Sequence, residues 1–128
     1  MSHLRPTAKC LLICLTILAM RAALAHPALL SSTPEENAEV VNTERIELHF
    51  SEKLVTQFSG ASLVMTGMPE MPGHAPMKMQ IKVSGTDDPK TMVITPTKPL
   101  PAGTYRIDWR AVASDTHPVT GSIHFSVK

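Results

Sequence analysis

Short segments in which apolar and polar residues alternate recur along most of this chain. The clearest is "TYRIDWRAV" (104–112), where aromatic and aliphatic residues occupy one phase and charged residues the other. The same pattern is found in five further segments, 45–50, 61–66, 79–84, 91–95 and 122–127. Successive side chains of a strand point to opposite faces of its sheet, so a period of two predicts half-buried strands. No long window carries a helical stripe, and an all-β protein is predicted.

Turn-forming sequences separate the predicted strands. "STPEEN", "SGTDDPK", "TKPLPAG" and "SDTHPVTG" are rich in the residues that favour turns. Neither an internal repeat nor a linker interrupts the pattern, so a single domain is expected. Six or seven short strands in about 100 residues predict a small antiparallel Greek-key sandwich or barrel. The only tryptophan, Trp109, falls on the apolar phase and is expected in the core.

The first 25 residues have the composition of a secretion signal. Two basic residues precede the apolar run "CLLICLTILAM" (10–20), and "ALA" (23–25) places small residues at the −3 and −1 positions of a cleavage site. A membrane anchor is the alternative, but the run is shorter than the about 20 residues that cross a bilayer, and Arg21 interrupts it. We therefore expect residues 1–25 to be a cleaved signal peptide and residues 26–128 to form the mature domain.

Cleavage would change the composition of the protein. Both cysteines, Cys10 and Cys14, would leave with the leader, so the domain would fold without disulfides in an oxidising compartment. Three of the twelve basic residues would also leave, and the remaining nine face eleven acidic residues, a formal charge of −2. The strongly basic surface of nucleic-acid-binding proteins is therefore excluded. We expect an exported protein that has no nucleic-acid partner and is not embedded in a membrane.

Residues 65–79, "MTGMPEMPGHAPMKM", contain five methionines, one histidine and three prolines. The prolines exclude a helix, and Met68 is out of phase with the other methionines for a strand, so a surface loop is predicted between Met65 and Met79. Exposed methionines can form an adaptable apolar surface for a partner protein. They can also bind Cu(I), because thioether sulfur is a soft ligand, and His74 adds an imidazole. We favour the metal site.

A second group of possible ligands centres on the new N-terminus. After cleavage, His26 would carry a free α-amine and an imidazole, and Pro27 has no backbone N–H that a metal could displace. In "SDTHP" (114–118), Asp115 and His117 are two residues apart, a spacing that points both side chains the same way in an extended segment. Two histidine nitrogens and one carboxylate oxygen suit Cu(II). Alone, however, Asp-x-His usually marks a turn.

The two remaining histidines of the predicted domain lie in predicted strands, His49 in "LHFSE" and His124 in "SIHFS". Both fall on the phase opposite to the apolar residues, which directs them toward solvent. We therefore expect them to be surface or structural residues and assign neither to a metal site.

Several segments together resemble the CopC/PcoC family of periplasmic copper-resistance proteins: "HPALLSSTPEE", "IELHFSEKLVTQFSGASLVMT", the Met/His loop, "DPKTMVITP" and "LPAGTYRIDWRAVASDTHPVTG". The resemblance runs the length of the predicted domain. It implies a seven-stranded Greek-key β-barrel with a cupredoxin-like or immunoglobulin-like topology. It also implies a copper carrier with one Cu(II) site, one Cu(I) site and no catalytic activity of its own.

The same resemblance implies which residues bind each ion. The Cu(II) site falls on His26, Asp115 and His117, and Glu52 is a carboxylate near it. The Cu(I) site falls on a set of thioethers and one imidazole: Met65, Met68, Met71, His74 and Met77. Met79 has no counterpart in the family. The implied partners are copper ions and a periplasmic multicopper oxidase or an inner-membrane copper transporter.

The main alternative is a copper monooxygenase with a histidine brace, because such enzymes also pair an N-terminal histidine with a second one. Those enzymes need a broad flat surface with exposed aromatic residues, and this domain has few. They also need an open coordination position, which Asp115 would fill. A sandwich domain that binds no metal is a third possibility, which tight binding of one Cu(II) would exclude. We predict a carrier and not an enzyme.

Overall fold

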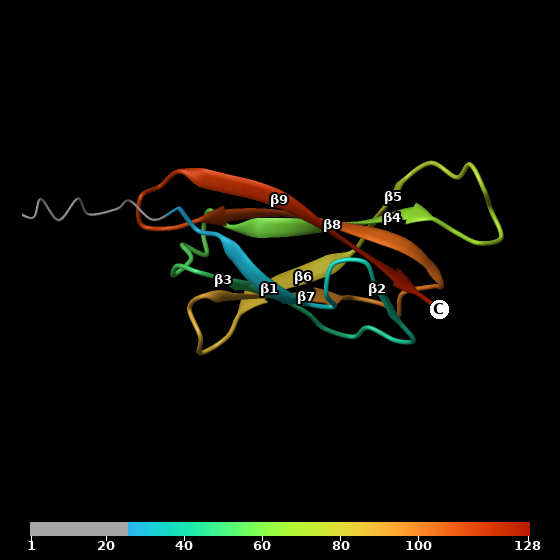
Figure 1. Ribbon diagram of the computed structural model, residues 1–128, viewed down its shortest axis with the longest axis horizontal. Coiled ribbons are helices and arrows are strands. Elements are labelled where there is room, and N and C mark those ends of the chain that lie inside the picture. Colours follow the sequence, from blue (N-terminus) through green and yellow to red (C-terminus); the bar gives the residue numbers. More distant parts are fainter. Residues whose placement is uncertain (1–25) are drawn as a thin grey trace, which may run out of the picture.

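The computed structural model describes residues 26–128, which form two β-sheets and no helix (Figure 1). The predicted signal peptide lies outside the described residues. The strands are β1 (Leu29–Thr33), β2 (Ala38–Val40), β3 (Ile46–Phe50), β4 (Gly60–Gly67), β5 (Met77–Met79), β6 (Ile81–Gly85), β7 (Thr91–Pro96), β8 (Gly103–Val112) and β9 (Pro118–Val127). Within this part of the chain, no helix is long and apolar enough to cross a membrane.

One sheet has the strand order β1-β3-β7-β6, and the other has the order β2-β9-β8-β4-β5. Every pair is antiparallel except β2 and β9, which run parallel. The predicted all-β architecture is therefore confirmed. Five of the six predicted segments become single strands, namely β3, β4, β7, β8 and β9.

The prediction of one strand over 79–84 is wrong. The chain leaves the five-stranded sheet after Met79 and enters the four-stranded sheet at Ile81, so Gln80 separates β5 from β6. Nine strands are formed where about seven were expected. The additional ones, β2 and β5, have three residues each, which is too short for a period of two to be recognised. In β1 a register shift between Leu29 and Ser31 breaks the alternation.

The core lies between the two sheets and contains the aromatic side chains of both. Trp109 is 7% exposed, as predicted for a core residue, and meets Phe50 edge to face at 5.1 Å between ring centroids. Gly121 pairs with Trp109 across β8 and β9. A Cβ atom at Gly121 would lie 2.4 Å from Cζ2 of the indole, so the ring occupies the space that any larger residue would need.

Tyr105 joins the start of β8 to the core. Its ring stacks on Phe125 at 5.4 Å, and its hydroxyl donates a hydrogen bond to the carbonyl of Pro101. A buried tyrosine that bonds to the backbone a few residues upstream is a tyrosine corner, a feature of immunoglobulin-like sandwiches. Burial raises the pKa of Tyr105 to about 12, because the phenolate would be poorly solvated there.

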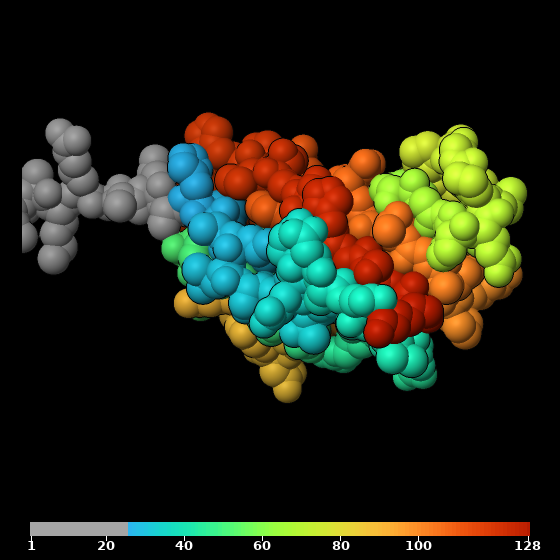
Figure 2. Space-filling model, turned by 45° about the vertical axis from the view of Figure 1, so that its right-hand side comes forward, coloured from blue at the N-terminus to red at the C-terminus, as the bar shows by residue number. Residues whose placement is uncertain are grey.

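Strand β8 runs between two ends of the domain. Its first residue, Gly103, lies against Gly67 and Met68, where the methionine-rich loop begins. Its last residue, Val112, precedes the turn into β9, which lies beside the start of the described chain (Figure 1). Ten residues of strand span about 33 Å. The methionine-rich loop stands out from the body of the domain at its own end (Figure 2).

Candidate metal centres

His26 is held at the end of the domain by the residues that follow it. Pro27 is buried, and the N–H of Ala28 donates to Ser51 Oγ at 2.9 Å. In return, the N–H of Ser51 donates to the carbonyl of Ala28 at 2.8 Å. These contacts anchor the chain just after His26, so the direction from which its ring approaches the β8–β9 turn is fixed by the fold.

The β8–β9 turn places Asp115 beside His26. The N–H of Thr116 donates to the carbonyl of Ala113 at 3.0 Å, and Thr116 has a φ of 64°. Asp115 Oδ1 accepts a hydrogen bond from the N–H of His117 at 3.3 Å, so the aspartate does cap its own turn. That role uses only one of its two oxygens.

The second oxygen, Oδ2 of Asp115, is buried without a donor. It lies 2.9 Å from His26 Nδ1, but the contact lacks the direction of a hydrogen bond, and no other described residue donates to it. The Asp115 side chain is 3% exposed, whereas that of His26 is 61% exposed. A buried carboxylate oxygen in this position favours a cation nearby.

The structure brings the three residues of the predicted Cu(II) site together. The rings of His26 and His117 lie 6.0 Å apart at an angle of 79°, and His117 is exposed. As they stand, no three histidine, cysteine or acidic side chains of residues 26–128 are arranged to hold one ion. Glu52 is half-buried next to Ser51, and it makes no hydrogen bond or ion pair with the other three side chains.

The methionine-rich loop is anchored at both ends by methionines that face the core. Met65 is 2% exposed and belongs to the core cluster, and Met79 packs against that cluster from β5. In the register of the two strands Met65 lies directly opposite Met77, and Leu63 lies opposite Met79. Met65 therefore differs from the other predicted Cu(I) ligands, because core packing already accounts for its position.

The loop itself contains two consecutive turns. The N–H of Met71 donates to the carbonyl of Met68, and the N–H of His74 donates to the carbonyl of Met71, each at 3.3 Å. These turns bring three predicted ligands onto successive corners of the loop. Met71 is 52% exposed and Met77 45%, in agreement with the prediction. Met68 was expected at the surface as well, but it is partly buried because it packs against the core.

Four buried side-chain nitrogen or oxygen atoms lack a hydrogen-bond partner among the described residues: Thr43 Oγ1, His74 Nδ1, Trp109 Nε1 and Asp115 Oδ2. Buried polar groups are normally paired, and each one left unpaired costs about 1–3 kcal/mol. Two of the four lie in the two predicted copper sites. Each predicted site therefore contains a buried basic atom that a metal ion would satisfy.

His49 and His124 lie on the surface, as predicted, and each has a carboxylate partner that the sequence pattern did not indicate. His124 Nδ1 is 2.9 Å from Glu36 Oε1. The backbone N–H of His124 also donates to Glu36, which lowers the pKa of that carboxyl. His49 Nε2 is 3.5 Å from Glu47 Oε2. Spacing along the strand could have suggested the second pair, because residues 47 and 49 share one face.

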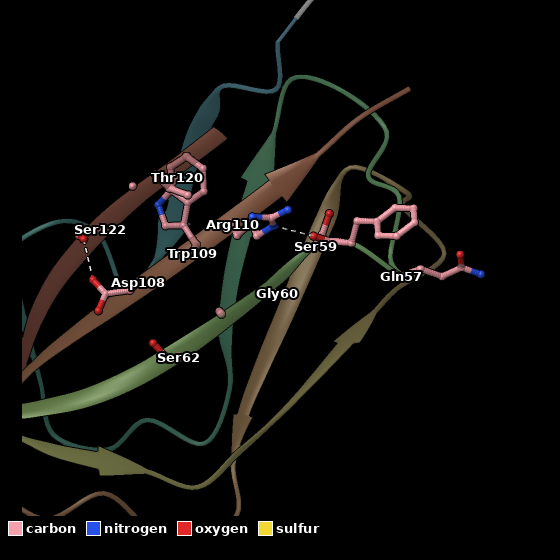
Figure 3. A pocket seen from close by; sticks show the side chains of 12 residues that line it. Gln57, Ser59, Gly60, Ser62, Asp108, Trp109, Arg110, Thr120 and Ser122 are labelled. Atoms are coloured by element: carbon pink, nitrogen blue, oxygen red, sulfur yellow. Dashed lines mark hydrogen bonds between the residues drawn. The ribbon is translucent and has the colours of Figure 1, made fainter. Parts of the chain in front are cut away.

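A shallow hollow lies on the outer face of the five-stranded sheet, across β4, β8 and β9 (Figure 3). Two hydrogen bonds join polar groups that line it. Ser122 Oγ donates to Asp108 Oδ1 at 2.7 Å, and Arg110 Nε donates to the carbonyl of Phe58 at 3.2 Å. No histidine, methionine or cysteine lines it, so it offers no ligands suited to copper.

Comparison with known proteins identifies the family. Residues 29–128 match the family described as the CopC domain. The chain belongs to the CopC family. It is 66% identical over 106 residues to copper resistance protein C of Pseudomonas syringae pv. tomato, with 83% of each chain covered. It is 57% identical over 107 residues to copper resistance protein C of Escherichia coli, with 84% of this chain and 85% of that protein covered.

A solved structure of the CopC family confirms the fold. The crystal structure of PcoC, described as a methionine-rich copper resistance protein from Escherichia coli, superposes with a TM-score of 0.75 at 57% identity. The match covers 81% of this chain and all of that one. The resemblance drawn from the sequence, including the Greek-key β-sandwich that it implied, is thereby confirmed.

Proposed function

We propose that this protein is a periplasmic copper carrier that contributes to copper resistance. It holds one Cu(II) and one Cu(I) at opposite ends of the domain and passes copper to partner proteins. The names of its relatives support copper resistance, and the two buried unpaired atoms carry the proposal, because each lies within one of the two ligand groups. In this proposal residues 1–25 direct export and are then removed.

The Cu(II) site consists of His26, Asp115 and His117. Two imidazole nitrogens and a carboxylate oxygen form a donor set of the kind that Cu(II) accepts. Cleavage adds the α-amine of His26, which supplies a further nitrogen. Support comes from Asp115 Oδ2, which faces the His26 ring without a hydrogen-bond donor. Glu52 makes no hydrogen bond or ion pair with the three ligands, and we assign it no more than a nearby negative charge.

The Cu(I) site consists of His74 and the thioethers around it. Backbone hydrogen bonds link Met68 to Met71 and Met71 to His74 in consecutive turns, and Met77 follows at the start of β5. Support comes from His74 Nδ1, which is buried without a partner. Met65 lies opposite Met77 and forms the inner wall of the site. We assign Met79 to the core.

Two sites of opposite softness suit a carrier in a compartment where copper occurs in both oxidation states. Reduction favours the thioether loop and oxidation favours the nitrogen and oxygen ligands. The described surface does not support the monooxygenase alternative, because four of the five aromatic residues are buried and only Phe58 is exposed. Copper would pass to a periplasmic multicopper oxidase or an inner-membrane copper transporter.

The Cu(II) site is tested by the position of the N-terminus. Protein that begins at His26 is compared with protein that carries one additional residue before it. Each is titrated with Cu(II) in air and with Cu(I) under reductant. We expect the additional residue to weaken Cu(II) binding and to leave Cu(I) binding unchanged. Equal losses for both ions would show that the protein has one site rather than two.

The Cu(I) site is tested by Met71→Leu. Met71 is exposed, so this swap removes a thioether with little effect on folding, and we expect Cu(I) affinity to fall about tenfold, or about 1.4 kcal/mol. Met92→Leu is the matched control, because that thioether is buried in the core, far along the sequence from the loop. If both variants bind Cu(I) as the parent does, Met71 is not a ligand.

A further inference from the structure

Glu47 and His49 project from β3 on the outer face of the four-stranded sheet. They are two residues apart on one strand, so both side chains point away from the core, and both are about one-third exposed. His49 lies between Ser31 of β1 and Thr91 of β7 in the register of the sheet. Neither residue belongs to the copper sites proposed above.

Hydrogen bonds fix the tautomer of His49. Thr91 Oγ1 donates to Asp88 Oδ2 at 3.0 Å, and the hydroxyl proton is used in that bond. Asp88 is ionised at neutral pH, because the backbone N–H of Lys90 and the Thr91 hydroxyl lower the pKa of its carboxyl. His49 Nδ1 lies 3.0 Å from the same Thr91 oxygen, which can then only accept. His49 therefore carries its proton on Nδ1.

The other ring nitrogen then faces a second base. With Nδ1 protonated, Nε2 of the neutral ring presents a lone pair, and it lies 3.5 Å from Glu47 Oε2. That distance is longer than an ordinary N–H···O hydrogen bond. In that form a lone pair faces a carboxylate oxygen, and a cation between them, either a proton on Nε2 or a metal ion, would remove the repulsion.

Arg45 holds the glutamate in place from the other side. Its Nε and Nη2 bind Glu47 Oε1 at 2.9 and 2.8 Å, which leaves Oε2 free and directed toward His49. The pair is thus oriented by bonds that use neither Oε2 nor Nε2. The guanidinium also places a positive charge near the pair, which weakens the binding of any cation without preventing it.

We propose that Glu47 and His49 form a third metal site, which binds a divalent cation of intermediate softness, Zn(II) or Cu(II). Two ligands that are each about 2.0–2.2 Å from one ion lie roughly 3.5 Å apart, the separation seen here. In metal sites, the ring nitrogen of a histidine that does not bind the metal usually donates a hydrogen bond. His49 Nδ1 makes such a bond to Thr91, which in turn bonds to a carboxylate. Water completes the coordination, so the site is weaker than one with three protein ligands.

The test is a Zn(II) titration of ¹⁵N-labelled protein that begins at His26, followed by NMR of the imidazole nitrogens. Each ring has its own resonances, so zinc at the His26 end is read separately. Before zinc is added, His49 should carry a proton on Nδ1. Zinc should then shift His49 Nε2 and leave the Nδ1 proton in place. With Cu(II), the His49 resonances should broaden only after those of His26 and His117.

Three variants make the test specific. Glu47→Gln keeps the shape of the side chain and should weaken the response of His49 at least about tenfold, and Thr91→Val should weaken it about tenfold by freeing Nδ1. His124→Asn is the control, because that histidine contacts its carboxylate through Nδ1 and no carboxylate faces its Nε2. A His49 that carries no proton on Nδ1, or one whose Nε2 is unchanged in a large excess of Zn(II), would overturn the proposal.

Discussion

Replacement of Asp115 by asparagine should separate folding stability from copper binding. The amide oxygen can still accept the hydrogen bond from the His117 N–H, so the turn is preserved. The new NH₂ group replaces Oδ2, which is buried without a donor 2.9 Å from His26 Nδ1. The variant therefore loses a buried negative charge and gains a donor where the parent has none.

The magnitudes follow from these contacts. An unpaired buried acceptor costs about 1–3 kcal/mol, and loss of the ion pair with the largely exposed His26 offsets about 1 kcal/mol of this at most, so the metal-free variant should be as stable as the parent or more stable by up to about 2 kcal/mol. For a domain of this size, 1 kcal/mol corresponds to about 4–8 °C in Tm. Cu(II) at 100 times its Kd adds about 2.7 kcal/mol, and a tenfold weaker site would retain only about half of that stabilisation.

Thermal unfolding with and without Cu(II) measures both effects on the same samples. We expect Asp115→Asn to raise or maintain the Tm of the metal-free protein and to reduce the rise that Cu(II) produces. Asp108→Asn is a suitable comparison, because Asp108 is also a paired carboxylate, bonded to Arg106 and Ser122, but lies on the outer face of the sheet. A metal-free variant that is clearly less stable than the parent, with an undiminished rise on addition of Cu(II), would refute the reasoning: Asp115 would then be structural.

Two further predictions concern the core. Gly121→Ala should lower the free energy of unfolding by about 1–3 kcal/mol, because the new methyl group overlaps the indole ring. Gly60→Ala is the control and should not destabilise the protein, because the space around Gly60 is open. Urea titration followed by tryptophan fluorescence measures both free energies. Stability should also fall as the pH rises from 10 to 12, since the unfolded chain loses the Tyr105 proton near its usual pKa and the folded protein retains it to about 12. If Tyr105→Phe shows the same loss over that range, another group is responsible.

The long strands were predictable because each keeps its alternation to its end. Strand β8 is the clearest case, with one phase buried along its whole length. Strand β1 was not predictable, because its bulge interrupts the phase and leaves Leu30 exposed. The change of sheet at Gln80 was also hidden, since the apolar residues on either side of it remain in phase. Which sheet a strand joins depends on distant partners, and no local pattern records it.

The candidate sites were predictable as sets of residue types, and less so as arrangements. The thioether ligands could be separated from the nitrogen and oxygen ligands by residue type alone. In the structure, His26, Asp115 and His117 lie close to one another. The partial burial of Met68 was not predictable, because it follows the predicted strand 61–66 in a proline-rich loop whose residues are expected at the surface. The pairing of His49 with Glu47 was also missed, because the outward phase of a strand was taken as a sign of simple exposure.

The length of β8 has a consequence for the rate at which copper changes site. The two proposed sites lie at opposite ends of a strand of about 33 Å, so no single ion can touch ligands of both within one molecule. Copper that moves from the thioethers to the nitrogen ligands must leave its protein or meet a second copy. Exchange between two copies is second order in protein, so dilution should slow it, and confinement of many copies in a small volume should accelerate it.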